Sequence, residues 1–259
     1  MPDRARRGTA VQAAPSSACP HDTLLWTADG SPTLLSARYG ETYRSRRGAH
    51  TEARHVFLEG TGVAGRLTRG ASTAVLEVGL GTATNLAWTA AAALASGAPL
   101  RYQAWEPRPL PAAQLADLRL ETVAPADFVA GLLAARDAWG ALPPGARRSW
   151  THGSVRLELV VAPIAQMATA PREGAVLDAF DAVYLDPFSP AVNPEAWTPA
   201  VLTALARALR PGGVLASYCV AGTVRRNLAA AGLEVSKVAG PPGGKREVLR
   251  ARRPDGGLP

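Results

Sequence analysis

Residues 73–81, TAVLEVGLG, constrain the fold of this chain more than any other stretch of its sequence. An apolar run of strand length ends there in Gly79 and Gly81, and an alanine-rich stretch of helical length follows, up to Gly97. A glycine directly after the last periodic residue is a typical end of a helix. A buried strand that turns through glycines into a helix predicts the first unit of an α/β sheet.

The same alternation continues along the chain. Thr198 is the expected N-cap of one helix, with Pro199 as its first residue and the glycines of RPGG as its stop. PPGG joins two final strands, 233–240 and 245–252. The prediction is an α/β fold with a doubly wound, mostly parallel sheet and an antiparallel C-terminal hairpin. The other predicted strands are 100–107, 155–163, 180–188 and 214–220, and the helices are 111–121, 125–139, 198–213 and 224–232.

The predicted organisation has three parts. Residues 1–22 carry arginines but no apolar segment of the kind found in signal peptides, so we expect a disordered tail. Residues 23–70 predict a small N-terminal cap of short strands and turns, in which a helix or strand ends at Gly60, and residues 71–254 form the α/β domain. No membrane span is expected, because no apolar run reaches about 18 residues. Cys19 and Cys219 suit no disulfide framework, which favours a reducing cytoplasm.

Positive charge is concentrated near the C-terminus. The net charge is +7, and residues 207–253 hold ten Arg or Lys against two Glu, a local excess of +8. A basic face predicts a polyanionic partner such as a nucleic acid. The alternative is a merely arginine-rich composition, since Lys237 and Lys245 are the only lysines.

The glycine loop favours one kind of cofactor. Gly79 and Gly81 lie where a backbone can approach a ligand closely, but Thr84 occupies the third glycine position of the fingerprint G-x-G-x-x-G. The loop therefore disfavours a dinucleotide and favours S-adenosylmethionine, which has no pyrophosphate. Glu106, at the end of the next strand, fits an acid that accepts hydrogen bonds from both ribose hydroxyls. The alternative is that the glycines only form a tight turn.

The stretch YLDPFSP, residues 184–190, ends another strand at the same edge of the predicted sheet. Asp186 can accept a hydrogen bond and a proton from an amine, and rigid Pro187 can aim nearby carbonyls at that amine. Phe188 can stack on a flat ring or pack against a cation. This pattern indicates alkylation of nitrogen, although a turn capped by Asp186 itself also explains it. Trp197 is expected to be a packing anchor.

Other familiar sites are absent from the sequence. The four histidines show no metal-site spacing, so no metal is expected. There is no G-x-S-x-G element for a serine nucleophile, and Cys219 is interpreted as a core residue.

Several motifs together resemble the methyltransferase domain of the bacterial bifunctional tRNA-modifying enzyme family MnmC, and the standalone versions of that domain. They occur in the family's order and cover most of residues 25–252. DPFSPAVNPEAW, which resembles the family pattern D-G/A-F-A-P-x-x-N-P-x-x-W, belongs to the most specific part. The other matching stretches include LWTADGSPTLLSARYGETYRS, EARHVFLEG, LEVGLGTATNL, WEP and GGKREVLRAR.

The resemblance implies a class I (Rossmann-like) methyltransferase that uses S-adenosylmethionine. It implies methylation of the 5-aminomethyl group on the wobble uridine of certain tRNAs, often 2-thiolated. Asp186 and Phe188 are then the expected catalytic residues, beside the methyl donor and the target amine. The residues expected at the cofactor are Glu77, Gly79, Gly81, Asn85, Glu106, Ile164 and Asp186. The residues expected to contact the tRNA substrate are Glu52 and Arg54 of the element E-x-R-x-V-F, together with Arg225, Arg226, Lys245 and Arg246.

Three departures from the family pattern stand out. Where the family has G-D after the third strand, at the expected adenine edge, this chain has Ala162 and Pro163, so backbone groups near Ile164 must substitute. Pro187 replaces a small residue. The chain is also expected to lack the flavin oxidoreductase domain of the bifunctional members, and whether a separate flavin-dependent enzyme supplies the aminomethyl intermediate stays open.

Two other functions remain compatible with these residues. An aminopropyltransferase of the spermidine-synthase type also has a glycine loop and a strand-end Asp, but its polyamine substrate calls for an acidic pocket rather than a basic tail. A cofactor-dead RNA-binding module is the other alternative, because of the missing adenine-binding Asp. Binding of S-adenosylmethionine separates such a module from an enzyme.

Overall fold

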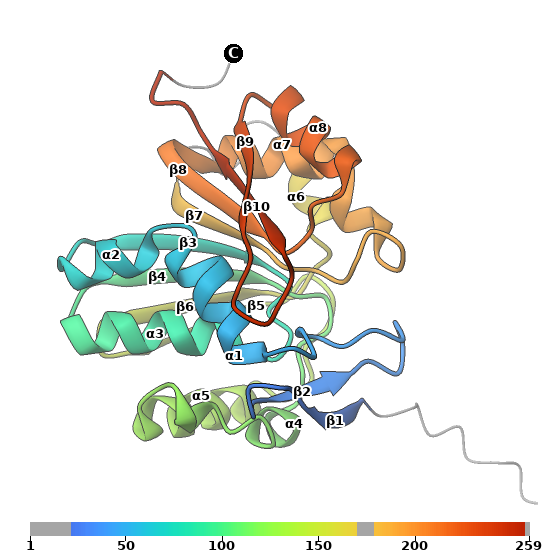
Figure 1. Cartoon of the computed structure of the whole chain (residues 1–259). Coiled ribbons are helices and arrows are strands. Elements are labelled where there is room, and N and C mark those ends of the chain that lie inside the picture. Colours follow the sequence, from blue (N-terminus) through green and yellow to red (C-terminus); the bar gives the residue numbers. More distant parts are fainter. Residues whose placement is uncertain (1–21, 170–178, 257–259) are drawn as a thin grey trace, which may run out of the picture.

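The main sheet follows the predicted alternation of strands and helices. The computed structural model describes residues 22–169 and 179–256. Its eight-stranded sheet has the order β5-β6-β4-β3-β7-β8-β10-β9, and the predicted α/β fold is confirmed (Figure 1). These strands are β3 (Thr73–Val78), β4 (Leu100–Trp105), β5 (Arg147–His152), β6 (Val155–Val160), β7 (Phe180–Leu185), β8 (Leu209–Ser217), β9 (Glu234–Ala239) and β10 (Glu247–Arg252).

The direction in which strands are added reverses at β3. β4 and then β6 lie on one side of β3, while β7 and β8 lie on the other, and all five strands are parallel. Val78 pairs with Trp105 on one side and with Leu185 on the other, so three strands end at one level. In open α/β sheets, ligands bind at the carboxyl ends of strands where the order reverses. The residues that follow these three ends are Gly79, Glu106 and Asp186.

Antiparallel strands lie at both edges of the sheet. The predicted C-terminal hairpin is confirmed, since β9 pairs antiparallel with β10 and β10 pairs antiparallel with β8. At the other edge, β5 pairs antiparallel with β6, and this strand was not predicted. Its sequence, RRSWTH, alternates exposed and half-buried residues, so no apolar run marks it.

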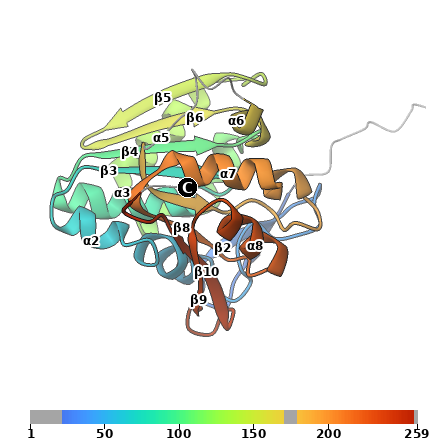
Figure 2. The ribbon, with the colours of Figure 1, turned by 90° about the horizontal axis from the view of Figure 1, so that it is seen from above.

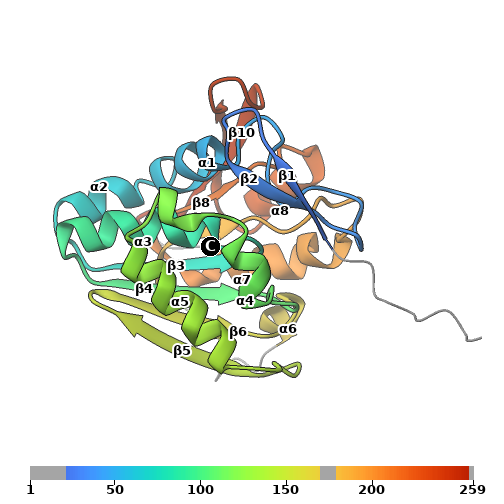
Figure 3. The ribbon, with the colours of Figure 1, turned by 90° about the horizontal axis from the view of Figure 1, so that it is seen from below.

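Helices cover both faces of the sheet, as the views from the side, above and below show (Figures 1, 2 and 3). Neighbouring residues of a strand point to opposite faces, and Val75 and Leu76 of β3 accordingly belong to two separate buried clusters. α3 (Thr84–Ser96) and α5 (Ala126–Ala138) pack in the cluster of Val75, and α7 (Pro199–Ala208) and α8 (Gly222–Ala230) in that of Leu76. The shorter helices between strands are α4 (Ala112–Ala116), η2 (Leu120–Thr122), α6 (Ala165–Thr169) and η4 (Pro194–Trp197).

The helix predicted over 198–213 is shorter than expected. It begins as predicted, because Thr198 Oγ1 accepts a hydrogen bond from the Val201 N–H at 3.4 Å. It ends at Ala208, and RPGG lies within β8, so the prediction that these glycines stop the helix was wrong. The reason is that β8 already pairs with β7 at Leu209. The register of this pairing shifts between Leu209 and Val214, and the glycines lie in that irregular part of the strand.

The helices of the N-terminal segment pack against α3, β3 and β8, and its loop between β2 and α1 lies at the edge where β3 ends. β1 (Thr23–Trp26) and β2 (Pro32–Leu35) form a two-stranded antiparallel sheet. The stretch before Gly60 is helical, and its Phe57 is buried in the same cluster as α3. The predicted disordered tail, 1–22, lies outside the described residues except for Asp22. The helices of this segment are α1 (Ala49–Glu52), the π-helix η1 (Ala53–Glu59) and α2 (Val63–Thr68).

Candidate active site

The predicted glycine loop lies directly against the strand end that carries Asp186. Gly79 has a φ of +86°, and a Cβ atom there would lie 3.0 Å from the Asp186 carbonyl oxygen and 3.3 Å from Cα of Pro187. At Gly81, a Cβ would lie 2.9 Å from Cδ1 of Tyr43. Side chains are therefore excluded at Gly79 and Gly81 by the neighbouring residues, and the backbone itself forms the surface there.

Glu106 lies at the far side of the same loop. Its Oε2 accepts a hydrogen bond from the Gly81 N–H at 3.1 Å, and its Oε1 accepts one from the Arg108 N–H at 2.9 Å. Burial raises the pKa of the Glu106 carboxyl, although these N–H groups oppose the increase. Each carboxylate oxygen keeps a lone pair for a further donor, such as a hydroxyl group.

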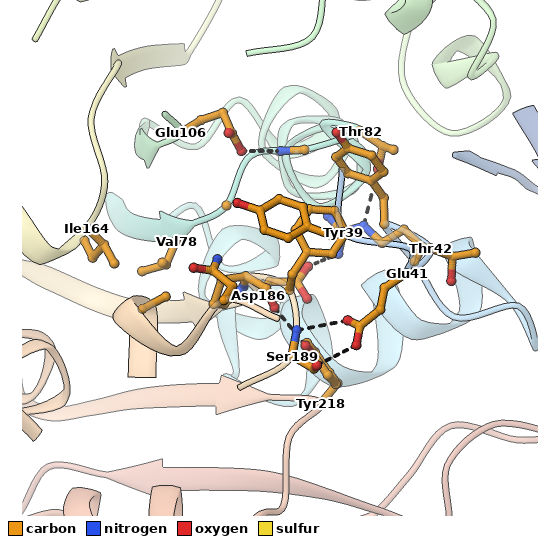
Figure 4. A pocket seen from close by; sticks show the side chains of 18 of the residues that line it. Tyr39, Glu41, Thr42, Val78, Thr82, Glu106, Ile164, Asp186, Ser189 and Tyr218 are labelled. Carbon is orange, nitrogen blue, oxygen red and sulfur yellow. Dashed lines mark hydrogen bonds and ion pairs between the residues drawn. The ribbon is translucent and has the colours of Figure 1, made fainter. Parts of the chain in front are cut away.

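A pocket of about 550 Å³ opens at this edge of the sheet (Figure 4). The strand-end loops form one part of its wall, and the loop between β2 and α1 forms the opposite part. Pro163 and Ile164, beside the expected adenine edge, line it as well. The predicted site residues that line the pocket are Glu52, Gly79, Gly81, Glu106, Ile164, Asp186, Phe188 and Lys245.

The Asp186 side chain is 3% exposed and surrounded by polar partners. Its Oδ2 accepts a hydrogen bond from Asn85 Nδ2 at 2.9 Å and forms an ion pair with Nη1 of Arg44. The same Asn85 nitrogen donates to Glu77 Oε1 at 2.8 Å, so Glu77 and Asn85 lie behind Asp186 rather than on the pocket wall. Burial raises the pKa of Asp186 to about 7, and the Arg44 guanidinium limits the increase. An acid with a pKa near neutrality is suited to accept and release a proton.

Two side chains fix the backbone of the turn that follows Asp186. The Pro187 carbonyl accepts a hydrogen bond from the Tyr218 hydroxyl at 2.8 Å, and the Phe188 carbonyl accepts one from Trp197 Nε1 at 2.9 Å. Trp197 is buried, which confirms it as a packing anchor. The sequence suggested that carbonyls of this turn face an amine, but both of these carbonyls accept hydrogen bonds from side chains of the protein.

The N-terminal segment closes over this turn. Glu41 accepts hydrogen bonds from the Ser189 N–H at 3.1 Å and from its hydroxyl at 2.5 Å. The ring centroid of Phe188 lies 4.3 Å from that of Tyr39 and 4.9 Å from that of Tyr43. The pocket therefore has an aromatic wall next to its buried acid.

The cations predicted to bind phosphate are placed differently from one another. Lys245 lines the pocket, and its Nζ lies 4.4 Å from the centroid of the Tyr218 ring. Arg225 is half-buried and donates to a backbone carbonyl, whereas Arg226 and Arg246 are exposed and do not line the pocket. Of the four, Lys245 is the residue that a ligand in the pocket can touch.

The two residues of the E-x-R element, Glu52 and Arg54, also differ in their position relative to the pocket. Glu52 is buried, lines the pocket and accepts a hydrogen bond from the Ser45 N–H at 3.2 Å. Burial raises its pKa, and Arg44 opposes the increase. Arg54 is exposed, pairs with Glu59 at 2.7 Å and does not line the pocket.

Sequence reasoning missed the contribution of the loop between β2 and α1. That loop has no hydrophobic periodicity and follows no strand of the main sheet. The one indication of a functional role in the sequence was that the loop belongs to the family-like motif ending in GETYRS. It places several side chains on the pocket wall, and Tyr218 is a further omission at the end of β8. The missed residues are Tyr39, Glu41, Tyr43, Arg44 and Tyr218.

Within residues 22–169 and 179–256, no group of three or more His, Cys, Asp or Glu side chains is arranged to hold a metal ion. In the same ranges, no helix combines the length and the apolar character needed to cross a membrane. Cys219 is a buried free thiol, and Cys19 lies outside the described residues.

Comparisons with known proteins agree with this geometry. Residues 132–254 match the model of a family described as S-adenosyl-L-methionine-dependent methyltransferase. The "tRNA 5-methylaminomethyl-2-thiouridine biosynthesis bifunctional protein MnmC" of Aromatoleum aromaticum is 36% identical over 240 residues, which cover 90% of this chain and 36% of that protein. The chain thus spans about a third of the length of the curated relatives it matches.

Solved structures show the same fold. MNMC2 from Aquifex aeolicus matches with a TM-score of 0.68 and 23% identity, over 89% of this chain and 70% of that one. A spermidine synthase matches with a TM-score of 0.50 and 15% identity, over 86% of this chain and 70% of that one, and this likeness concerns the fold alone. The chain therefore shares the fold of these structures, and its sequence is similar to one part of the MnmC proteins and, over residues 132–254, to a family of S-adenosylmethionine-dependent methyltransferases.

Proposed function

We propose that this chain transfers a methyl group from S-adenosylmethionine to the amine of 5-aminomethyl-uridine, 2-thiolated or not, at the wobble position of tRNA. The observation that carries the proposal is the placement of Asp186. It is a buried acid at a strand end, against a glycine loop and beside the aromatic wall of a pocket. The relatives' printed name, which specifies 5-methylaminomethyl-2-thiouridine in tRNA, supports the choice of amine.

The residues of the pocket fit the cofactor. No side chain projects from the loop at Gly79 or Gly81, so a ligand can approach the backbone there, and Glu106 presents a carboxylate held by two N–H groups. Buried carboxylates favour a cationic ligand, and Glu52 and Asp186 both line the pocket. When bound, S-adenosylmethionine supplies an electrophilic methyl group on a sulfonium. This fit argues against a cofactor-dead module.

The chain's own task is to prepare the amine for attack. A primary alkyl amine is mostly protonated at neutral pH and then has no lone pair to react. Asp186 is positioned to accept a hydrogen bond from the ammonium and to take its proton, which leaves the nitrogen lone pair available. The rings of Phe188 and Tyr39 offer a surface on which a uracil ring can stack.

The partners follow from this substrate. Lys245 at the pocket is proposed to contact the tRNA phosphates, together with Arg225, Arg226 and Arg246 outside the pocket lining. A separate flavin-dependent enzyme is proposed to supply the aminomethyl intermediate. A tRNA substrate also agrees with the expected cytoplasmic location.

The direct test is methyl transfer by the purified chain. tRNA that carries 5-aminomethyl-uridine is incubated with S-adenosylmethionine, and the wobble nucleosides are identified by mass spectrometry. We expect 5-methylaminomethyl-uridine to form, and tRNA without the aminomethyl group to remain unchanged. Cofactor binding without methylation of this tRNA would refute the substrate, and absence of cofactor binding would refute the reaction. A strain deleted for the gene should accumulate 5-aminomethyl-uridine.

Gly79→Ala is expected to weaken S-adenosylmethionine binding by about 10-fold or more, or about 1.4 kcal/mol, because the loop has to shift from its position at the pocket. Its new Cβ would also press on the Asp186 carbonyl, 3.0 Å away. Gly70→Ala is the matched control, because its φ of +72° carries similar strain but nothing lies within 4 Å of a Cβ there. Both variants should lose stability to urea, but only Gly79→Ala should lose cofactor affinity. Equal cofactor affinities would remove the loop from the site.

A further inference from the structure

Arg44 is a buried cation that the proposed reaction leaves unexplained. It is 3% exposed, and it lines the pocket from the loop between β2 and α1. Its Nε donates to Thr82 Oγ1 at 3.3 Å, and its Nη1 pairs with Asp186. Its Nη2 lies 3.7 Å from Glu77 Oε1, which is an ion-pair distance rather than a hydrogen bond. A guanidinium has five N–H donors, so Arg44 can serve a further acceptor in the pocket.

The charges around Arg44 suit a ligand that is itself a zwitterion. Three buried acids, those of Glu52, Glu77 and Asp186, lie around this single guanidinium. Burial raises the pKa of each, to about 8 for Glu77, and a bound ammonium would favour their carboxylate forms. A ligand ammonium is favoured by the surplus of carboxylates, whereas a ligand carboxylate in the same place needs a cation within reach. The amino-acid end of S-adenosylmethionine carries both charges. An isolated acid or an isolated amine would match only half of this arrangement.

The position of Arg44 along the pocket agrees with that end of the cofactor. Glu106, the predicted ribose acid, is bonded to the N–H of Gly81, and the next residue, Thr82, is bonded to Arg44. The loop therefore runs from the ribose acid to the guanidinium, with Asp186 beside Gly79 and Arg44. A cofactor that holds its ribose at Glu106 and its methyl group near Asp186 extends its amino-acid end toward Arg44.

The other cations of the pocket lining are less suited to this role. Arg38, Arg108 and Lys245 are exposed, and Arg108 donates through Nη2 to the Tyr39 hydroxyl at the outer part of the pocket. An exposed cation gains little from a carboxylate, because water screens the pair, while a buried and pre-positioned guanidinium gains more.

We propose that Arg44 binds the α-carboxylate of S-adenosylmethionine and thereby selects this cofactor over analogues that lack the carboxylate. The proposal rests on the cofactor assigned above but not on the tRNA substrate. It also gives a physical reason against aminopropyl transfer, because the donor of an aminopropyl group carries no carboxylate on the carbon chain that is transferred. Arg44 is then a specificity-determining residue of the cofactor site.

The test compares equilibrium binding of three probes by calorimetry: S-adenosylmethionine, its decarboxylated analogue, and 5′-methylthioadenosine, which lacks the whole amino-acid end. Wild-type protein should bind S-adenosylmethionine more tightly than the decarboxylated analogue. Arg44→Met should weaken the binding of S-adenosylmethionine by about 10- to 100-fold, the range for a lost hydrogen bond to a charged group. The affinity for the decarboxylated analogue should stay the same or increase. Arg108→Met, the same substitution at an exposed cation of the lining, should leave the preference intact.

Folding is controlled within the same measurements. Binding of 5′-methylthioadenosine to Arg44→Met reports an intact nucleoside site. If the methionine variant does not fold, Arg44→Lys replaces it, because lysine keeps the positive charge. Its preference for S-adenosylmethionine over the decarboxylated analogue should be smaller than that of wild type, because the planar guanidinium is lost. A wild-type protein that binds the decarboxylated analogue at least as tightly overturns the proposal, as do equal losses for both ligands in Arg44→Met. If wild-type protein binds no S-adenosylmethionine, the proposed function fails as well, whereas binding without discrimination refutes the role of Arg44 alone.

Discussion

Asp186→Asn is expected to lower kcat for methyl transfer to tRNA by about 100-fold or more, which is the usual loss when a general base is removed. Asn has nearly the same size and still accepts a hydrogen bond from the amine, but it cannot take a proton. The ion pair with Arg44 is also lost, so binding of both substrates is expected to weaken. kcat must therefore be measured with tRNA and S-adenosylmethionine both saturating, because weaker binding then does not enter the result.

Asp181→Asn is the matched control, because it makes the same change within β7, the strand that Asp186 follows, and away from the pocket lining. The Asp181 carboxylate pairs with Arg66 at 3.0 Å and with Arg210 at 3.1 Å. Losing these pairs should lower stability while leaving kcat unchanged. A kcat for Asp186→Asn within about threefold of wild type would show that the proton leaves the amine by another route.

The same carboxylate predicts the pH dependence of the wild-type enzyme. Burial raises the pKa of Asp186 to about 7, Arg44 opposes the increase, and Glu52 adds to it. The ionised form is the proton acceptor, so kcat should fall about tenfold per pH unit below about pH 7 and level off above it. Asp186→Asn should lack this acidic limb. A wild-type kcat that stays constant from pH 5.5 to about 8 would contradict the role of Asp186.

The sequence predicted those parts of the site that lie at strand ends. Gly79, Glu106 and Asp186 could be brought together in advance, because parallel strands end at one edge of their sheet, and a strand can be recognised from its apolar run. The C-terminal hairpin was predictable for a similar reason, since PPGG separates two apolar stretches. These predictions depend on local patterns and on one rule of sheet geometry.

The rest of the site depends on tertiary packing that no local pattern records. Arg44 lies in a loop of polar residues, where an arginine is ordinarily exposed, and only the fold reveals that it is buried against Asp186 and Glu77. The same holds for Glu41, which meets Ser189 across 148 positions of the sequence. The assignment of Arg54 to the tRNA substrate stays a prediction, because it depends on the family motif, and the exposed side chain pairs with Glu59 outside the pocket lining.

The double charge reversal Lys245→Glu and Arg246→Glu should weaken tRNA binding more strongly than the same reversal at exposed arginines far from the pocket. Lys245 lines the pocket over the Tyr218 ring, and Arg246 is exposed next to it. If each residue neutralises one phosphate, the slope of log affinity against log salt should become shallower by about 2, from about 0.9 per contact. Filter binding or fluorescence anisotropy of tRNA over a salt series measures both the affinity and the slope.

Charge reversal also acts at long range, so a control with the same change in net charge is needed. Arg69 and Arg156 are both exposed, and both lie where strands of the sheet begin, since Arg69 precedes β3 and Arg156 is the second residue of β6. Arg69→Glu with Arg156→Glu therefore removes as much positive charge from the end of the sheet opposite the pocket. A contact role for Lys245 and Arg246 requires that their reversal lower the salt slope while the control keeps it. If both double variants lose affinity equally with the wild-type slope, the basic C-terminal region attracts tRNA only through its overall field, and the phosphate contacts must lie on other residues.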